Sequence, residues 1–292
     1  MPPAIASFVH GADALGECPI WDERAGALRW IDIGAPALRR CDASGSDVRS
    51  LALPETIGSY ALRERFPGLL AAMRSGLYLL DPDTGERAPF VRPEPDLPGN
   101  RFNDGRCDRA GRFWAGTMSM AERKPSGSLY RVDPDRGCAR VRTGITIPNS
   151  IAWSPDGRTL YFADTPRRVI WALACDPATG EILSERVFAE SPGDPGGPDG
   201  SCVDADGCLW NAEYGRWRLV RYTPRGTVDR VVALPVANPT CCCFGGPDLE
   251  TLFVTTARQR LAAEELARQP LAGSVLALLP GVRGLPESRF AG

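Results

Sequence analysis

Four polar side chains stand at one position relative to a repeated turn, and together they could perform metal chemistry. Counting five residues back from the start of the turn gives Glu17, Asn103, Asn149 and Asp199. Two carboxylates and two amides form a hard oxygen-donor set that suits Ca²⁺, Mg²⁺ or Mn²⁺ and also accepts Fe²⁺ or Zn²⁺. A divalent ion would offset the repulsion between the carboxylates. The four side chains therefore predict a metal site or, as the alternative, polar groups that hydrogen-bond loop backbone.

An arginine accompanies this set. Arg101 precedes Asn103 by two residues, so both side chains lie on the same face of an extended strand. A cation there could hold an oxyanion or a hydroxylated ligand, or could pair with Asp104 instead. The single histidine, His10, lies before any repeat, which excludes Ser-His-Asp catalysis and a multi-histidine metal site. Any chemistry must therefore use carboxylates, amides and arginine, with or without a metal.

A turn followed by an aromatic or aliphatic strand recurs along the chain and must position these side chains. We count six copies, one of them degenerate, and each is followed by a second strand that ends in a polar turn. The copies begin at Asp22, Phe66, Asp108, Ser154, Asp204 and Gly246. The period of roughly 40 to 50 residues, with about four strands per unit, is typical of propeller blades and not of helical solenoids.

These repeats predict an all-β six-bladed β-propeller with four strands per blade, formed by residues 1–292 as one domain; a β-sandwich with irregular turns is the alternative. The first strand of each blade lines the channel, so equivalent positions lie at similar height around it. Helical periodicity is expected only at Leu261–Gln269. We expect four tryptophans at strand positions to pack in the core: Trp30, Trp114, Trp153 and Trp210.

Composition limits the partners and the compartment. Apolar residues make up 43% of the 292 residues and the formal net charge is −2, so neither nucleic acid nor a membrane surface is expected to bind. Residues 1–16 carry no secretion-signal pattern, which predicts a cytoplasmic protein. The ten cysteines are expected to be reduced and mostly buried, including Cys241, which also falls on the ring by the repeat count. We expect a monomer or a weak dimer.

The chain resembles the SMP-30/gluconolactonase/regucalcin-like family of six-bladed propellers nearly from end to end. The resemblance rests on the order and spacing of six motifs: Gly16-Glu-Cys-Pro-Ile-Trp21, Arg101-Phe-Asn-Asp-Gly105, Ala115-Gly-Thr-Met118, Pro148-Asn-Ser150, Pro198-Asp-Gly200 and Cys243-Phe-Gly-Gly-Pro-Asp248. The C-terminal part is most similar to the bacterial sugar-lactonase branch. The resemblance implies hydrolysis of an aldonolactone, with pentono- or hexonolactones favoured over bulkier esters.

The same resemblance implies roles for individual residues. It implies a divalent metal held by Glu17, Asn149 and Asp199, and a sugar lactone contacted by Arg101 and Asn103, with Asp104 close by. Family members often have a substrate-binding glutamate after the Gly-Thr-Met run. Direct register puts Ala121 there, and Glu122 is one place further on. Ser150 stands where the family usually has glycine after the metal-binding asparagine.

The mechanism expected from these roles is metal-assisted ester hydrolysis. The ion polarises the lactone carbonyl and Asp199 takes a proton from the attacking water. The residues leave two other functions open. One is a lactonase or esterase for other substrates, including organophosphates; the other is a calcium-binding or scaffolding propeller without turnover. Arg101 and Asn103 argue against the latter, because calcium buffering needs no arginine that recognises a substrate.

Overall fold

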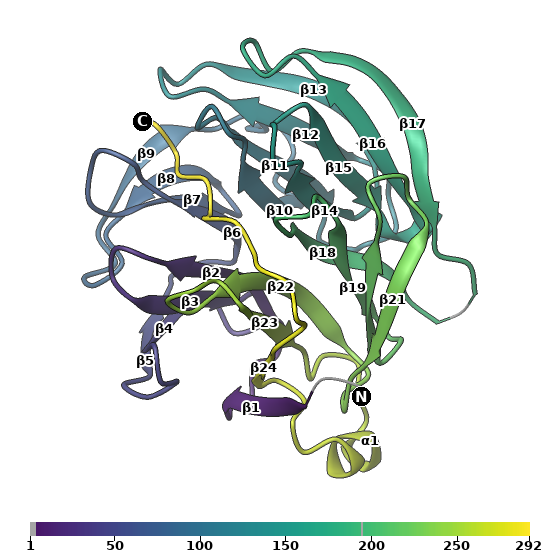
Figure 1. Cartoon of the computed structure of the whole chain (residues 1–292). Helices are drawn as coiled ribbons and strands as arrows, with labels where there is room; N and C mark the ends of the chain where they lie inside the picture. Colours follow the sequence, from purple (N-terminus) through teal and green to yellow (C-terminus); the bar gives the residue numbers. More distant parts are fainter. Residues whose placement is uncertain (1–3, 194) are drawn as a thin grey trace.

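Six sheets stand in a ring around a central channel. The computed structural model describes residues 4–193 and 195–292, and it consists almost entirely of strands. Each sheet, or blade, has four antiparallel strands (Figure 1). In five of the blades the strands follow one another in sequence from the channel outward, because short turns join antiparallel neighbours. The structure confirms the predicted six-bladed propeller with four strands per blade.

The strands of blades 1 to 5 are four to nine residues long and follow one another from the channel outward. Blade 1 has β2 (Gly16–Asp22), β3 (Ala27–Asp32), β4 (Ala37–Asp42) and β5 (Arg49–Ala52), and blade 2 has β6 (Ile57–Leu62), β7 (Leu69–Met73), β8 (Gly76–Leu80) and β9 (Arg87–Val91). Blade 3 has β10 (Asn100–Cys107), β11 (Phe113–Ser119), β12 (Gly127–Val132) and β13 (Cys138–Ile145). Blade 4 has β14 (Pro148–Trp153), β15 (Thr159–Asp164), β16 (Val169–Cys175) and β17 (Ile182–Glu190), with the 3₁₀ turn η1 (Thr165–Arg167), and blade 5 has β18 (Gly197–Val203), β19 (Leu209–Tyr214), β20 (Arg218–Tyr222) and β21 (Val228–Ala233).

Blade 6 closes the ring by joining both ends of the chain. Its inner strands are β22 (Pro239–Gly245), β23 (Thr251–Thr256) and β24 (Val275–Leu278), and its outer strand is β1 (Ile5–Val9). β1 pairs antiparallel with β24. The short helix α1 (Ala263–Arg268) lies between β23 and β24, within the segment where a helix was predicted.

The repeated aspartate turn is held by one buried carboxylate. In blade 5, Asp204 accepts hydrogen bonds from the backbone N–H groups of Asp206 and Cys208 and from the indole of Trp210, at 2.9–3.0 Å. Asp108 binds the corresponding groups in blade 3, including the Trp114 indole at 3.0 Å. The carboxylate thus fixes the hairpin and satisfies a buried tryptophan at once. All four predicted core tryptophans are at most 3% exposed.

The innermost strands are interrupted by β-bulges. The register with the second strand shifts between Glu17 and Ile20, between Phe102 and Gly105, between Asn149 and Ala152, and between Pro198 and Ser201. At each shift two residues of the inner strand oppose one residue of its neighbour, which bends the strand and redirects its side chains. The bulges fall beside the side chains that the repeat count placed on one ring.

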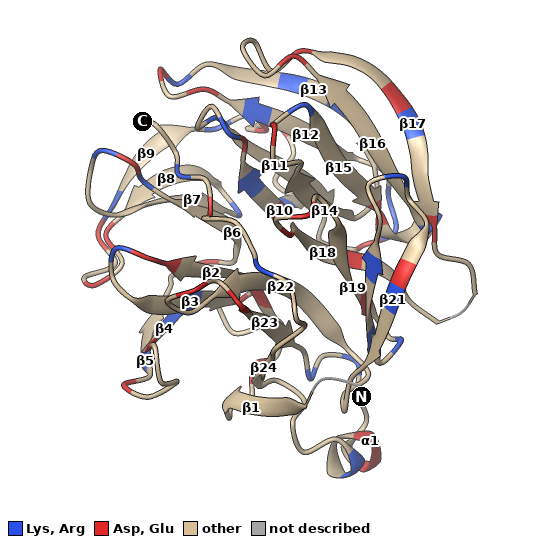
Figure 2. Cartoon of the chain, viewed as in Figure 1, with Lys and Arg blue, Asp and Glu red and all other residues tan. Residues whose placement is uncertain are grey.

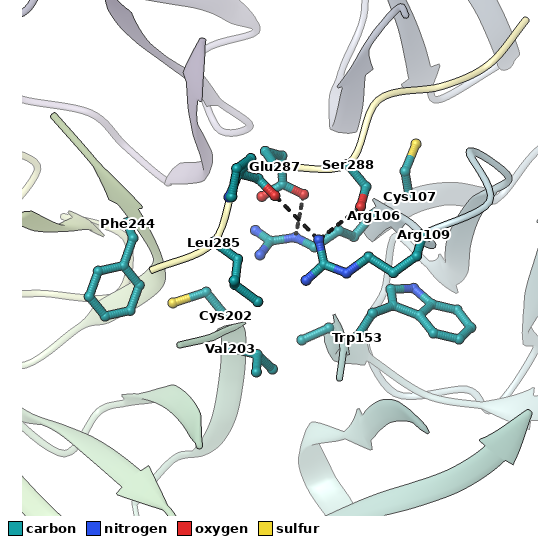
Figure 3. A pocket seen from close by; sticks show the side chains of 12 residues that line it. Arg106, Cys107, Arg109, Trp153, Cys202, Val203, Phe244, Leu285, Glu287 and Ser288 are labelled. Atoms are coloured by element: carbon teal, nitrogen blue, oxygen red, sulfur yellow. Dashed lines mark hydrogen bonds and ion pairs between the residues drawn. The ribbon is translucent and has the colours of Figure 1, made fainter. Parts of the chain in front are cut away.

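The C-terminal segment after β24 covers one end of the channel. It is drawn in yellow in Figure 1, where it crosses in front of the inner strands. Figure 3 shows Glu287 directed toward Arg106, whose Nε lies 3.6 Å from the Glu287 carboxylate. Arg109 donates to Ser288 Oγ at 3.1 Å, and Phe290 is fully buried. The inner strands therefore end beneath this segment and begin at the opposite, open end.

Charged side chains of both signs are mixed on the surface, and the cysteines are free and mostly buried. Figure 2 shows acidic and basic residues next to each other on the outer strands β17 and β21. All ten cysteines are free thiols, and all but Cys138 are buried, as predicted. Within residues 4–193 and 195–292, no helix has both the length and the apolar character needed to cross a membrane.

The turn carboxylates make a testable contribution to stability. Asp204→Ala leaves two backbone N–H groups, an indole and the Nε of Arg221 without their acceptor, so we expect a loss of about 3–5 kcal/mol in the free energy of unfolding. Asp206→Ala removes only an exposed partner of Arg221 and should lower the free energy of unfolding by less than about 1 kcal/mol. Urea unfolding of both variants measures the difference, and equal losses would contradict this role of the turn.

Candidate functional site

A cavity opens where the inner strands of blades 1, 3, 4 and 5 begin. Its lining combines the starts of these strands, the ends of the second strands and two loops. The lining residues are Leu15, Glu17, Arg101, Asn103, Met118, Glu122, Ile147, Asn149, Thr165, Asp199, Tyr214, Gln259 and Arg260. The structure thus gathers in one cavity the three predicted metal ligands, the two predicted lactone contacts and Glu122.

A chain of hydrogen bonds orients the arginine and the two amides. Arg101 donates to Asn103 Oδ1 at 2.7 Å, and Asn103 Nδ2 donates to Asn149 Oδ1 at 3.0 Å. Asn149 Nδ2 in turn donates to Thr165 Oγ1 at 2.7 Å. Both amides therefore have a defined orientation, and Asn149 Oδ1 keeps one lone pair for a further partner.

Glu17 and Asp199 are two carboxyls crowded into the same buried place. They are 9% and 6% exposed. Burial, together with the negative charge of Asp104, raises the pKa of Glu17 to about 8. Burial and the charge of Glu17 raise the pKa of Asp199 well above its usual range. The positive charge on neighbouring protein groups is too small to offset burial and mutual repulsion, so ionising both carboxyls costs free energy.

This donor set fits a divalent cation. Two carboxylates and an amide oxygen are hard ligands, and a doubly charged ion would supply the missing positive charge. The set contains only two acidic side chains, and no group of three or more His, Cys, Asp or Glu in the described part of the chain could hold a metal. An oxygen site of mixed carboxylate and amide character is therefore the arrangement that these residues offer.

Arg101 brings a buried positive charge to the same cavity. It is 9% exposed, and burial lowers its pKa to about 10, while the charges of Glu17 and Asp199 act in the opposite direction. The guanidinium therefore remains charged at neutral pH. Because it has five N–H donors and uses only some of them on Asn103 and the Phe102 carbonyl, it can also bind a ligand oxygen.

Asp104 lies close enough to Glu17 for its charge to act on that carboxyl, but it is not part of the cavity lining. Its carboxylate accepts the backbone N–H of Ile151 at 2.8 Å and so links blade 3 to blade 4. Burial raises the pKa of Asp104 to about 6. Because Asp104 directly follows Asn103 in the bulge, the two side chains point in different directions. The structure thus shows Asp104 linking two blades, and its predicted contact with a sugar lactone stays a prediction.

The structure shows where the two residues lie that differ from the family pattern, Glu122 and Ser150. Glu122, and not Ala121, lines the cavity, so the one-residue offset does not remove a carboxylate from it. Ser150 adopts a φ of 59°, in the left-handed region that glycine prefers, and its hydroxyl shares a 2.6 Å hydrogen bond with Ser201. Cys241 is 1% exposed and does not line the cavity, which agrees with the predicted buried thiol.

Sequence reasoning missed several residues of the lining. Met118 pairs with Arg101 across the first two strands of blade 3, and Tyr214 ends the second strand of blade 5. Extending the repeat count to the ends of second strands would have found these two. Gln259 and Arg260 belong to the loop between β23 and α1, and no repeat or motif indicated their place.

The chain is similar to known proteins along almost its whole length. The model of the family described as the SMP-30/Gluconolactonase/LRE-like region matches residues 15–258. The 6-deoxy-6-sulfogluconolactonase of Pseudomonas putida is 40% identical and covers the full length of both chains. The L-arabinolactonase of Azospirillum brasilense is 39% identical over 96% of this chain and 93% of its own. The crystal structure of a calcium-binding protein, regucalcin, from Agrobacterium tumefaciens superposes with a TM-score of 0.94 at 35% identity, covering 100% of this chain and 99% of that one.

The crowded carboxyls predict how stability depends on pH when no metal is bound. A carboxyl whose pKa is raised on folding stabilises the protein fully at low pH, and this stability is lost as the pH rises through the folded pKa. For Glu17 the loss extends from about 4.5 to about 8. In chelator, the melting temperature of the wild-type protein should therefore fall over this interval. Glu17→Gln should melt higher at pH 8 and show a flatter profile, whereas parallel profiles would contradict the crowding.

Proposed function

Since this chain belongs to the SMP-30/gluconolactonase/LRE-like family, we propose that it hydrolyses a sugar lactone, the cyclic ester of an aldonic acid, with the help of a divalent metal ion. The observation that carries the proposal is the cavity that combines Glu17, Asn149 and Asp199 with Arg101 and Asn103. The first three supply oxygen ligands and the other two supply donors and an acceptor for a polar ligand.

The metal ligands we propose are the carboxylates of Glu17 and Asp199 and the Asn149 amide oxygen. Their hardness allows Ca²⁺, Mg²⁺, Mn²⁺, Zn²⁺ or Fe²⁺, and the similarity to a calcium-binding protein favours Ca²⁺ among them. Such an ion, when bound, supplies a Lewis acid for an ester carbonyl and makes a bound water more acidic.

The protein's own groups have separate tasks in the hydrolysis. Arg101 and Asn103 bind oxygen atoms of the sugar and hold the ester against the carboxylates. Asp199 accepts a proton from the attacking water through its carboxylate. The water oxygen bonds to the carbonyl carbon, the ring C–O bond breaks, and the released ring oxygen takes the proton from Asp199 to become a hydroxyl, which leaves Asp199 ionised again. The products are the ring-opened aldonic acid and the regenerated site.

The substrate we propose is an aldonolactone of five or six carbons. Two relatives that match along almost their whole length are named for a sulfogluconolactone and an arabinolactone, both of this class. The polar lining of the cavity suits a hydroxylated ring, because each hydroxyl needs a donor or an acceptor once it leaves water.

A calcium-binding propeller without turnover is the second candidate, and it is favoured by the regucalcin similarity. The buried Arg101 argues against it. A protein that only binds calcium gains nothing from a buried guanidinium beside its ligands, because like charges repel.

Asp199→Asn tests the proposed proton transfer. The substitution preserves the size and one oxygen of the side chain but removes its basicity, so turnover should fall by about 10²–10⁴-fold. Hydrolysis of glucono-1,5-lactone in a pH-indicator assay, with metal content measured by mass spectrometry, gives the comparison. Asp206→Asn changes an exposed aspartate of the same blade and should retain full activity. Undiminished turnover by the Asp199 variant with metal bound would disprove the assignment.

Metal removal tests the cofactor and separates the two candidate functions. We expect chelated protein to lose hydrolysis of glucono-, xylono-, arabinono- and galactonolactones, and at least one restored divalent ion to recover it, because the carboxyl pair needs the ion's charge. The same assay with each ion in turn identifies the metal. If calcium binds but no lactone is hydrolysed with any ion, the protein is a calcium-binding propeller.

A further inference from the structure

An ion pair spans the mouth of the cavity. Glu122 lies in the loop after β11 of blade 3, and Arg260 lies in the loop after β23 of blade 6. Blades 3 and 6 lie on opposite sides of the ring formed by the six blades. The two loops therefore approach the cavity from opposite sides. The Arg260 guanidinium pairs with the Glu122 carboxylate, and both side chains line the cavity. A molecule that occupies the cavity can therefore contact both side chains of this pair.

Both partners have backbone conformations that are unfavourable for their residue types. The φ angle is 65° at Arg260 and 56° at Glu122. Glycine adopts this left-handed region readily, whereas residues with a Cβ do so at a cost in stability. Such conformations concentrate at ligand-binding sites, where the side chain has a role that outweighs the strain. The structure therefore singles out these two side chains from the rest of the cavity mouth.

The backbone that carries Arg260 is held firmly. The carbonyl oxygen of Gln259 accepts hydrogen bonds from the Tyr214 hydroxyl at 3.1 Å and from Asn238 Nδ2 at 3.0 Å. The Gln259 N–H donates to the Ala14 carbonyl at 2.9 Å. Tyr214 itself lines the cavity. Arg260 is thus presented from a preorganised loop, which lowers the entropy lost when its guanidinium binds a ligand.

The ion pair itself can be exchanged. The side chain of Arg260 is 58% exposed and that of Glu122 is 24% exposed. Pairs in contact with water contribute little free energy, so another anion can take the place of Glu122 on the guanidinium. A neutral sugar would have to separate the pair without replacing it. An anionic sugar would separate it and supply a new partner for Arg260.

We propose that the substrate is an aldonolactone bearing a phosphate, sulfonate or carboxylate at the carbon remote from the lactone carbonyl, and that Arg260 binds this group in place of Glu122. The inference rests on the proposed lactonase function and adds a substrate class and a specificity residue to it. Arg101 cannot fill this role, because it lies among the buried metal-binding residues and already faces Glu17 and Asp199.

A matched pair of lactones tests the proposal. We expect wild-type kcat/KM for 6-phosphoglucono-1,5-lactone to exceed that for glucono-1,5-lactone by about tenfold or more, the value of one charged hydrogen-bonded contact. Arg260→Gly should remove this preference, so that the ratio of the two kcat/KM values falls to about one, mainly through a higher KM for the phosphorylated lactone. Glu122→Gln removes the competing carboxylate and should increase the preference. Arg258→Ala removes an exposed charge from the same loop, outside the cavity lining, and should change neither value.

Other outcomes would overturn the proposal in distinguishable ways. A wild-type enzyme that prefers the neutral lactone, or an Arg260→Gly variant with an unchanged preference, overturns the proposal while the lactonase function stands. Because glycine relieves the strain at this position, Arg260→Gly should melt no lower than wild type; a lower melting temperature with equal loss on both lactones makes Arg260 structural and overturns it.

Failure of the lactonase function itself is tested separately. If the wild-type protein hydrolyses neither lactone, titration calorimetry with 6-phosphogluconate and gluconate decides the role of Arg260. About tenfold weaker binding of the phosphorylated acid alone by Arg260→Gly supports the anion site even then. Equal affinities of wild type and variant for both acids overturn it.

Discussion

Closure of the ring is the constraint on which the remaining structure depends. β1 from the start of the chain adds the outer strand to the blade formed by β22, β23 and β24 near its end. This pairing brings blade 1 next to blade 6 and, through it, close to blade 5. Glu17 and Asp199 meet for this reason, although a large part of the chain separates them. The raised pKa values of the two carboxyls and the need for a balancing positive charge both follow from their being held together.

Holding them together requires a rigid surround, and the structure supplies it with hydrogen bonds between blades. Asn103 of blade 3 donates to Asn149 of blade 4, whose amide donates to Thr165, and the Thr165 hydroxyl donates to the Pro198 carbonyl of blade 5. Asp104 adds a link from blade 3 to Ile151. At the other end of the channel, contacts of Glu287 and Ser288 with blade 3 perform a similar task. The carboxyls cannot relax apart, so their charge must be balanced by protons or by a cation.

Four residues other than glycine have unfavourable backbone conformations beside the cavity. Cys18 and Ser150 have left-handed φ angles beside the bulges next to Glu17 and Asn149, and Glu122 and Arg260 have them at the mouth. Residues with a Cβ are less stable in this region than glycine, so a fold optimised for stability alone would not keep four of them around one cavity. At the opposite end of the channel, turn carboxylates such as Asp204 accept several buried hydrogen bonds and stabilise the hairpins.

The fold and the ring of polar side chains could be predicted from the amino-acid sequence, because both depend on local interactions. In blades 3 and 5 a turn aspartate accepts hydrogen bonds from the N–H groups two and four residues ahead. Because turns recur at similar spacing in the other blades, a fixed count from each turn reaches a similar height around the channel. Which of these side chains meet depends on contacts between blades. The bulge turned Asp104 toward blade 4, and the left-handed backbone brought Glu122 into the cavity. Arg260 could not be predicted, since contacts with blades 1 and 5 and with Asn238 set the direction of its loop, and such contacts between distant segments leave no periodic trace in the sequence.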